Sequence, residues 1–243
     1  MITSFRFKKL CDNIYLHVYE SFYDLTMSVV RIQEFYESSK FQGKFLTLEE
    51  YMDWYCEKQK TQVFTYTGAF CGFNWPGKSL LKWCHKYGYN GPESVSNPNI
   101  RKKEIQLLKP VWKLGTEEVA KSYFILGTLQ DKDLYATILH EIAHALYCIE
   151  PEYKKRCMKI FNSIPACQRK KLYGYLRRNL YSSFRYKDEI QAYLSTGGIR
   201  SLKTSYYKCQ AQYRNNLNRF LSLPKYKKLL QKIEKYQNHQ PQK

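Results

Sequence analysis

Three residues near the middle of the chain, His140, Glu141 and His144, have the types and spacing that suit metal chemistry, in the pattern H-E-x-x-H. Two histidines four positions apart lie on one face of an α-helix, so both imidazoles can reach a single Zn²⁺ at about 2.0–2.1 Å. Glu141 is rotated by about 100° from His140, which suits it to take a proton from a water molecule that the metal activates. The pattern therefore predicts two zinc ligands and a general base.

The sequence around this pattern predicts a helix from Leu134 to Ile149. Asp131 or Asp133 can cap its start, and Pro151 ends it. Apolar residues recur along it at intervals of three and four positions, which gives the helix a buried side. These residues are Leu139, Ile142, Ala143, Leu146 and Ile149.

With this motif on a helix, the chain resembles the zincin superfamily of zinc metallopeptidases. The resemblance implies an α+β, zincin-like fold, in which an edge strand ahead of the active-site helix pairs with the backbone of a peptide substrate. Lys121–Leu129 (KSYFILGTL) has the composition of such a strand. We expect a single catalytic domain over residues 1–243. It has a mixed strand and helix part over 1–130, then the active-site helix and a helical, basic part over 131–243.

A catalytic zinc ion needs three protein ligands and one open position, so a third ligand is expected. The gluzincin group of zincins takes a glutamate from a second helix, and the segment DEIQAYL around Glu189 resembles that helix. Its E-x-x-A run would place a small Ala where the two helices meet. Many gluzincins have an Asp four residues after this Glu, where this chain has Tyr193. The resemblance therefore favours Glu189 but leaves open which residue orients the histidines.

Two other residues compete for the position of third ligand. In the metzincin pattern the last position falls on Glu150, but Tyr147 then stands where the turn-forming Gly should be. His85 comes before the motif, out of the usual zincin order. Zincins also often use Tyr or His to stabilise the oxyanion of the reaction. On a helix, Tyr186 and Tyr193 share the face of Glu189 whereas Tyr181 does not, and Tyr186 is our first candidate.

The net charge of +19 is unevenly distributed along the chain. Residues 1–150 contain 18 Lys and Arg against 17 Asp and Glu, whereas residues 151–243 contain 22 against 4. A basic field of this kind attracts acidic partners, and the candidates are an acidic protein substrate, nucleic acid and an anionic membrane surface. The alternative is a solvated lysine-rich surface that binds nothing.

Other features of the composition bound the class of protein. A content of 44% hydrophobic residues is enough for a core, and no run approaches 18 apolar residues. The N-terminus lacks the hydrophobic region of a signal peptide. The eight Cys form no C-x-x-C pair, which favours reduced thiols. We therefore expect a cytoplasmic protein of a reducing compartment with no transmembrane segment, and delivery as an effector is compatible with this.

Local patterns predict the remaining elements. We expect strands over residues 14–18 and Thr26–Gln33, and a helix after the capping box Thr47-Leu48-Glu49-Glu50. A short strand should begin at Gln62. A helix over Ser79–Tyr87 should stop at Gly88, and Ile100–Trp112 has strand and helix signals together. Helices are expected over Glu152–Phe161, Ala166–Ser182, the Glu189 segment up to Gly197-Gly198, Ser201–Leu223 and Lys225–Tyr236.

The leading interpretation is an intracellular, zinc-dependent endopeptidase in which Zn²⁺ is held by His140, His144 and Glu189 and Glu141 moves the proton. The alternative is a nucleic-acid-associated basic protein, either a protease that acts on DNA-bound proteins or a binder with an inert motif. A structural zinc site is a third interpretation, but such sites usually use Cys and close all four positions. The substrate, the cleavage site and the oligomeric state do not follow from the sequence.

Overall fold

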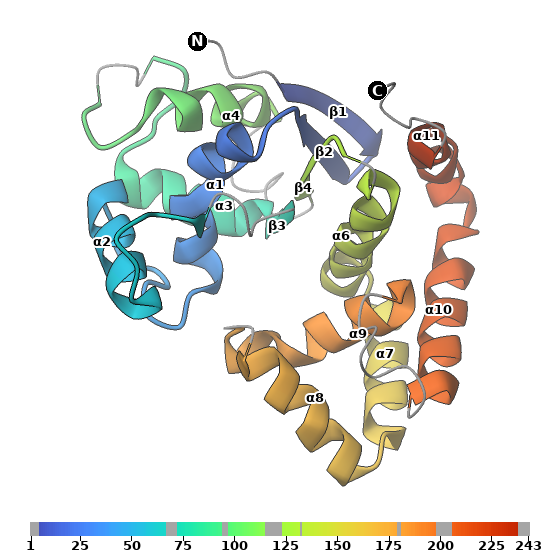
Figure 1. Cartoon of the computed structure of the whole chain (residues 1–243). Helices are drawn as coiled ribbons and strands as arrows, with labels where there is room; N and C mark the ends of the chain where they lie inside the picture. The colour runs from blue at the N-terminus through green and yellow to red at the C-terminus, as the bar shows by residue number, and fades with distance from the viewer. Residues whose placement is uncertain are drawn as a thin grey trace. The chain divides into compact units, whose positions relative to one another are not determined.

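Strands and helices are interspersed in the first half of the chain, and helices follow one another in the second half (Figure 1). The computed structural model describes residues 5–66, 72–93, 97–114, 123–131, 133–178, 181–197 and 206–237. The chain divides into two units. Unit 1 is Met1–Lys9 with Tyr15–Asp131, and unit 2 is Leu10–Ile14 with Lys132–Lys243. The mixed α+β class that we expected is confirmed.

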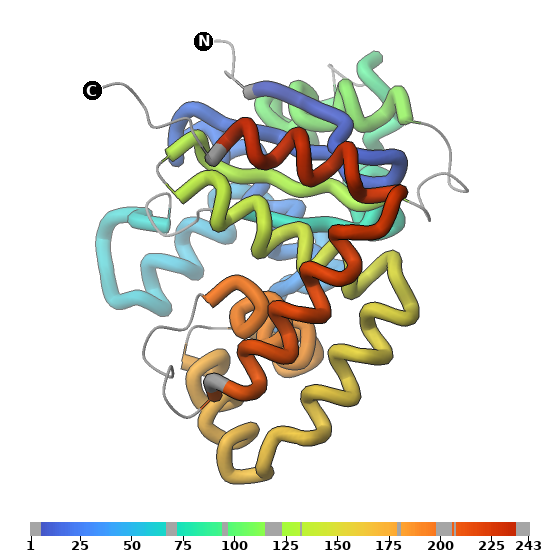
Figure 2. The backbone as a smooth tube through the Cα atoms, turned by 90° about the vertical axis from the view of Figure 1, so that its right-hand side faces the viewer, coloured from blue at the N-terminus to red at the C-terminus, as the bar shows by residue number. Residues whose placement is uncertain are grey.

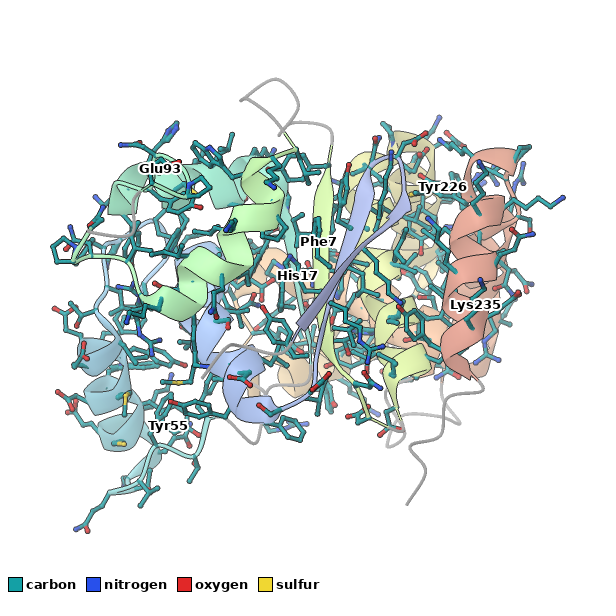
Figure 3. The ribbon with its side chains drawn as sticks, turned by 90° about the horizontal axis from the view of Figure 1, so that it is seen from above. Phe7, His17, Tyr55, Glu93, Tyr226 and Lys235 are labelled. Carbon is teal, nitrogen blue, oxygen red and sulfur yellow. The ribbon has the colours of Figure 1, made fainter. Side chains whose placement is uncertain are left out.

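Unit 1 combines a four-stranded sheet with helices. Its elements are β1 (Phe5–Cys11), β2 (Ile14–Tyr19), α1 (Phe22–Glu37), α2 (Leu48–Gln59), β3 (Gly72–Pro76), α3 (Gly77–Tyr87), α4 (Lys102–Trp112) and β4 (Phe124–Leu129). Helix α1 packs on β3, β4, α3 and α4. In the sheet, Phe7 of β1 packs on His17 of β2, with ring centroids 4.7 Å apart (Figure 3).

The strand expected before the helix that holds His140 and His144 exists, but it is not an edge strand. The order of the sheet is β1-β2-β4-β3, so β4 pairs on both sides and the described edges are β1 and β3. All six residues of β4 are buried, as expected for a continuous apolar run in the middle of a sheet. The prediction of an edge strand over Lys121–Leu129 is therefore wrong, because composition indicates a strand but not its neighbours. Residues 121 and 122 lie outside the described residues.

A glycine in β4 determines how β3 packs against it. The two strands are antiparallel, with Phe73 opposite Gly127. A Cβ atom on Gly127 would lie 1.8 Å from the Phe73 ring, so only glycine leaves room for the ring there. Phe73 in turn stacks on Trp75 with ring centroids 4.0 Å apart.

Several predictions for unit 1 need correction. Thr26–Gln33, expected as a strand, lies within the 16-residue helix α1. Ser21 caps this helix by accepting a hydrogen bond from the Asp24 amide at 3.0 Å, and the buried residues Leu25, Val29 and Ile32 follow helical spacing. The strand expected at Gln62 is also wrong, because β3 begins at Gly72. The mixed signals of Ile100–Trp112 resolve into the helix α4.

Two helix boundaries in unit 1 follow the predicted signals. The capping box of Thr47 and Glu50 is present at the start of α2. Helix α3 ends at Gly88, which has the left-handed φ of 71° that favours glycine at this position. Its start at Gly77 is two residues before the expected Ser79.

Unit 2 contains the helices that were expected. They are α6 (Leu134–Ile149), α7 (Pro151–Ser163), α8 (Ala166–Arg178), α9 (Tyr186–Thr196), α10 (Tyr207–Leu221) and α11 (Lys227–Gln237), with short 3₁₀ turns η3 (Ser183–Arg185) and η6 (Pro224–Tyr226). Helix α9 ends at Gly197, which has a left-handed φ of 83°. Gly198 of the predicted cap and residues 201–205 of the predicted helix lie outside the described residues.

Helix α6 is the centre of unit 2. It packs against α7, α9 and α11, while α10 packs against α7 and α9 (Figure 1). Its residues Ile142, Ala143, Ala145 and Leu146 have no exposed surface. The contact with α9 is the one that matters for chemistry, because these two helices carry the predicted metal ligands. Among the described residues, no helix combines the length and the apolar composition that crossing a bilayer requires.

Candidate metal centre

Helices α6 and α9 meet through small residues and one amide side chain. Ala143 of α6 and Ala192 of α9 are both fully buried, in keeping with the close approach expected from the E-x-x-A run. Gln191 donates a hydrogen bond from Nε2 to the carbonyl oxygen of Ala143 at 3.1 Å, which ties the two helices at this point. The contact brings His140, His144 and Glu189 together as one group whose ligand atoms lie within 4.8 Å of one another.

The two imidazoles face each other through their Nε2 atoms, which are 3.3 Å apart. His144 is buried and His140 is half-buried, with ring centroids 4.9 Å apart. Two unprotonated ring nitrogens at this distance would direct lone pairs at each other. Either one of the two nitrogens therefore carries a hydrogen that it donates to the other, or both bind a metal ion.

The Nδ1 atom of each ring is occupied, which leaves Nε2 for the metal. For His140 the partner is Thr196 of α9, with 3.4 Å between Nδ1 and Oγ1. The Thr196 hydroxyl donates its own hydrogen to the carbonyl of Ala192 at 2.8 Å. Its oxygen is thus an acceptor for the Nδ1–H of His140. With Nδ1 of His140 as the donor, its Nε2 carries the lone pair.

For His144 the partner is a carboxylate, that of Asp188. His144 Nδ1 donates to Asp188 Oδ1 at 2.8 Å, and Gln191 Nε2 donates to the same oxygen at 3.2 Å. Arg185 Nη1 lies 3.0 Å from the other oxygen, Oδ2. Asp188 is therefore held from three sides in a buried position. It answers the question of which residue orients a histidine when no Asp follows Glu189 by four positions.

The charges of this group change the pKa values of its members in opposite directions. Burial lowers the pKa of His140 to about 3, and His144 contributes in the same direction. Burial also disfavours charge on His144, but the carboxylates of Asp188 and Glu189 outweigh it and raise the pKa of His144 to about 9. Burial would raise the pKa of Asp188, yet His144 and Arg185 lower it to about 2. The carboxylate of Asp188 is therefore ionised at neutral pH.

The donor set fits a divalent cation. Ligands at about 2.0–2.2 Å in a tetrahedral arrangement lie roughly 3.3–3.5 Å from one another. The two Nε2 atoms are 3.3 Å apart, and Glu189 Oε2 is 3.7 Å from His144 Nε2. Glu189 is only 3% exposed, and two imidazoles with one carboxylate are the ligand types of three-ligand zinc sites. Of the residues that the structure describes, this is the group of His, Cys, Asp and Glu that could hold a metal ion.

The competing candidates for third ligand lie elsewhere. Glu150 follows the end of α6, where its Oε1 accepts hydrogen bonds from Lys225 and, at 2.6 Å, from the Tyr226 hydroxyl. His85 is an exposed residue of α3 in unit 1. Neither belongs to the group that contains His140 and His144.

Glu141, the predicted general base, is 6% exposed. Its carboxylate raises the pKa of both His144 and Tyr193, the former after the larger effects of Asp188 and Glu189. Its charge therefore acts on the residues around the metal group.

The two tyrosines that share the face of Glu189 have different surroundings. Tyr186 begins α9, and its ring lies against Tyr173 of α8, with centroids 5.2 Å apart. The ring of Tyr193 lies 4.7 Å from that of His140, and its hydroxyl is 2.8 Å from the hydroxyl of Tyr181. Tyr193 and Tyr181 are thus next to a predicted ligand, although spacing had ranked Tyr186 first and set Tyr181 aside.

A buried polar network surrounds Gln191, the residue that donates a hydrogen bond to Asp188. The oxygen of Gln191 accepts a hydrogen bond from the Tyr153 hydroxyl at 2.8 Å and from the Cys157 thiol at 3.9 Å. Asn216 of α10 donates to the Cys157 sulfur at 3.3 Å. Burial raises the pKa of Cys157 to about 12, so this thiol stays protonated and serves as a donor. Hydrogen bonds of this network therefore join four helices, α6, α7, α9 and α10, next to Asp188.

Asp188, Thr196 and Gln191 were not predicted from the sequence as parts of the site. One signal was available for Asp188, because a carboxylate directly before a predicted ligand lies on the same turn of the helix. Thr196 lies seven residues after Glu189, two helical turns away on the same face. Spacing alone gives no reason to prefer these residues over other polar residues of the same helix.

Comparisons with protein-family models, with curated protein sequences and with solved structures found no match to this chain. The interpretation of the site therefore depends on its own geometry and chemistry.

Proposed function

We propose that this chain is a zinc-dependent peptidase of gluzincin type, with His140, His144 and Glu189 as the metal ligands. One observation carries the proposal. Both histidines have Nδ1 occupied by residues of α9, so that their Nε2 atoms converge next to the Glu189 carboxylate. A structural histidine pair has no need of this arrangement. Three ligands rather than four leave one position for water or substrate, as catalytic zinc sites require.

When bound, the zinc ion would polarise a substrate carbonyl and lower the pKa of a water molecule. Glu141 would accept a proton from the attacking water and return it to the nitrogen of the leaving amine. The Asp188 carboxylate would keep His144 in the tautomer that binds metal, and the Thr196 hydroxyl would do the same for His140. Each role belongs to an atom that already has the required contact or charge.

For the donor to the oxyanion we propose Tyr193 in place of Tyr186. Tyr193 contacts His140, and burial together with the charges of Glu189 and Glu141 raises its pKa, so that the phenol keeps its proton. Tyr181 accepts from or donates to its hydroxyl and limits its rotation. Tyr193→Phe should lower kcat by about 10²–10³-fold, whereas Tyr186→Phe should leave it unchanged. Equal effects of the two variants would remove this assignment.

The proposal is tested by metal analysis and proteolysis on matched variants. Wild type and Glu141→Gln should each contain one zinc per chain, whereas Glu189→Ala should lose it. Proteolysis of unfolded protein substrates, read by mass spectrometry of the new termini, should be lost in Glu141→Gln. Glu150→Gln is the control carboxylate, because Glu150 binds Lys225 and Tyr226 instead of the metal group.

Two results would overturn the proposal. The first is a wild-type protein that neither contains zinc nor takes it up on reconstitution. The second is proteolysis by Glu141→Gln at the wild-type rate. If Glu189→Ala binds zinc as wild type does, Glu189 is not a ligand, but zinc binding by the protein still stands.

A further inference from the structure

The outer side of helices α10 and α11 is almost entirely basic and polar. We refer to the exposed residues between Lys208 and Lys235 as the α10–α11 face. They are Lys208, Ala211, Gln212, Arg214, Asn215, Asn218, Arg219, Ser222, Pro224, Lys225, Lys227, Lys228, Gln231, Lys232, Glu234 and Lys235. Eight of them are Lys or Arg, and Glu234 is the single acid. Figure 2 shows the two helices in succession at the front of the molecule, and Figure 3 labels Lys235 on α11.

The spacing of these cations brings like charges together. Lys228, Lys232 and Lys235 are four and three positions apart, so they lie on one side of α11. On α10, the exposed cations Lys208, Arg214 and Arg219 are six and five positions apart, so they are distributed along the helix instead of lying next to one another. Like charges at the spacings of α11 destabilise a helix by roughly 0.2–0.5 kcal/mol per pair. A partner that supplies negative charge along the helices would relieve this repulsion.

The apolar residues of both helices are used inside unit 2. Leu217 and Leu221 of α10 and Leu229 and Ile233 of α11 are at most 3% exposed. The α10–α11 face itself has no exposed large hydrophobic residue. Helices that lie in a membrane surface insert Trp, Phe or Leu below the headgroups, and this face has none to insert. An anionic membrane is therefore a poor match.

A nucleic acid backbone is the better match. The α10 and α11 helices are roughly 22 Å and 16 Å long at 1.5 Å per residue, and cations occur along both. A duplex carries one negative charge per about 1.7 Å of its axis, so it offers charge over the same length. The amides of Gln212, Asn215 and Asn218 add donors for phosphate and sugar oxygens. A compact acidic patch on a protein would meet only part of this length.

We propose that the α10–α11 face binds the phosphate backbone of nucleic acid without reading its sequence. This inference is independent of the metal group, because none of its residues belongs to that group. It explains the excess of positive charge in the second half of the chain as a surface that binds one class of partner, nucleic acid. Sequence-independent binding of this type depends steeply on salt.

The test compares two variants of equal net charge by fluorescence anisotropy with a labelled 20-base-pair duplex. The first changes Lys227, Lys228, Lys232 and Lys235 to Gln. The matched control changes four exposed lysines of α3 and α4 in unit 1 to Gln, namely Lys78, Lys82, Lys86 and Lys109. Both lower the net charge from +19 to +15, because each removes four positive charges.

We expect the α11 variant to bind at least about tenfold more weakly at low salt. Its slope of log K against log salt should fall by about 0.9 for each phosphate that the variant no longer neutralises. The control should bind within about twofold of wild type. Equal weakening in both variants would overturn the proposal, and so would a wild type that does not bind at about 50 mM salt. Circular dichroism checks that the helices remain. If the fourfold variant does not fold, Lys228→Gln with Lys235→Gln gives the same comparison.

Two competitors identify the partner class. Phosphatidylserine vesicles and polyglutamate are each added at the same concentration of negative charge as unlabelled duplex. Unlabelled duplex should displace the probe, and the other two should displace it at least about tenfold less well. Vesicles that compete equally would replace this proposal with a membrane surface. Equal competition by polyglutamate would replace it with an acidic protein.

Discussion

Unit 1 and unit 2 each bury a cluster of charged side chains, and the two clusters follow opposite rules. In unit 1, Arg31 is 3% exposed and Glu104 is 1% exposed. Arg31 Nε donates to Glu104 Oε1 at 2.8 Å, and Nη2 binds the second oxygen of the same carboxylate. Two of the remaining guanidinium hydrogens go to the carbonyls of Leu46 at 3.2 Å and Asn99 at 2.9 Å. Donors meet acceptors, and one positive charge meets one negative charge.

In unit 2, the side-chain atoms that can bind a metal ion converge. The Nε2 atoms of His140 and His144 face each other, and the Glu189 carboxylate lies beside them. The donors of the group, on Arg185 and Gln191, are directed at Asp188 instead. In this arrangement either a proton on His144, whose pKa the neighbouring carboxylates raise to about 9, or a metal ion lies among these atoms.

The difference shows how a buried polar cluster can be sorted before any activity is known. A cluster whose donors and acceptors balance among themselves needs nothing more, as Arg31 and Glu104 illustrate. A cluster in which two imidazoles and a carboxylate converge needs a proton or a metal ion among them, as His140, His144 and Glu189 illustrate. The following variants are designed to break or to sharpen this comparison, from the largest expected effect to the smallest.

Arg31→Leu should lower the free energy of unfolding of unit 1 by about 3–5 kcal/mol, because it leaves the buried Glu104 without its counter-charge. Arg31→Leu with Glu104→Gln should recover most of this loss, since the pair is then neutral and Gln can still accept from the Arg101 amide. Urea unfolding followed by Trp fluorescence measures the free energy of unfolding of each variant. All four Trp lie at or before Trp112, within unit 1.

In this series zinc content is the control. It should stay at the wild-type level in both Arg31 variants, because the metal group is in unit 2. A loss below about 1 kcal/mol in the single variant would mean that the pair is solvated, as surface pairs are.

Asp188→Asn should weaken zinc binding by about 10–100-fold, because the amide orients His144 without the negative charge that increases its basicity. The measurement is competition with a chromophoric chelator at pH 7. The matched control is Glu152→Gln, which removes one exposed carboxylate of the same unit and should leave the zinc Kd unchanged. An unchanged Kd in Asp188→Asn would show that His144 needs no carboxylate, and the comparison between the two clusters would then rest on Glu189 alone.

His17→Phe should change how the stability of unit 1 depends on pH. Burial lowers the pKa of His17 to about 3 in the folded chain, against 6.5 as its ordinary value. The unfolded chain therefore binds the proton first as the pH falls below 6.5. His17 then removes stability progressively down to pH 3, by about 1.4 kcal/mol at pH 5.5.

The difference between wild type and His17→Phe isolates this contribution from that of other groups. The two unfolding curves should keep a constant separation above pH 7 and should shift toward each other or cross as the pH falls, with wild type losing stability faster. Curves that stay parallel from pH 8 to pH 5 would mean that His17 has the same pKa in the folded and the unfolded chain.

The sequence alone determined those features that depend on a few neighbouring residues. Helical spacing placed His140 and His144 on one side of a helix whose ends the structure confirms at Leu134 and Ile149. Capping chemistry at Thr47 and the left-handed glycines Gly88 and Gly197 likewise set helix ends where they were expected. Backbone geometry repeats with a fixed period, so a short segment is enough to state it.

Tertiary structure decided every feature that joins distant segments. The strand before the active-site helix was recognisable, but only the sheet gives β4 two neighbours. The helix α1 was taken for a strand because buried β-branched residues suit both forms when their partners are unknown. Tyr193 replaced Tyr186 beside His140 for the same reason, since both share a face of α9 and only packing separates them.

The metal group itself shows which features follow from the sequence and which need the tertiary structure. The sequence supplied the two imidazoles and, through a resemblance, Glu189 at a distance of 45 positions. The orienting pair, Asp188 and Thr196, followed only once α9 lay against α6. A hydrogen bond between residues 44 or 56 positions apart depends on how two helices pack, and packing is set by shape and burial across the whole unit. No local period of the chain contains that information.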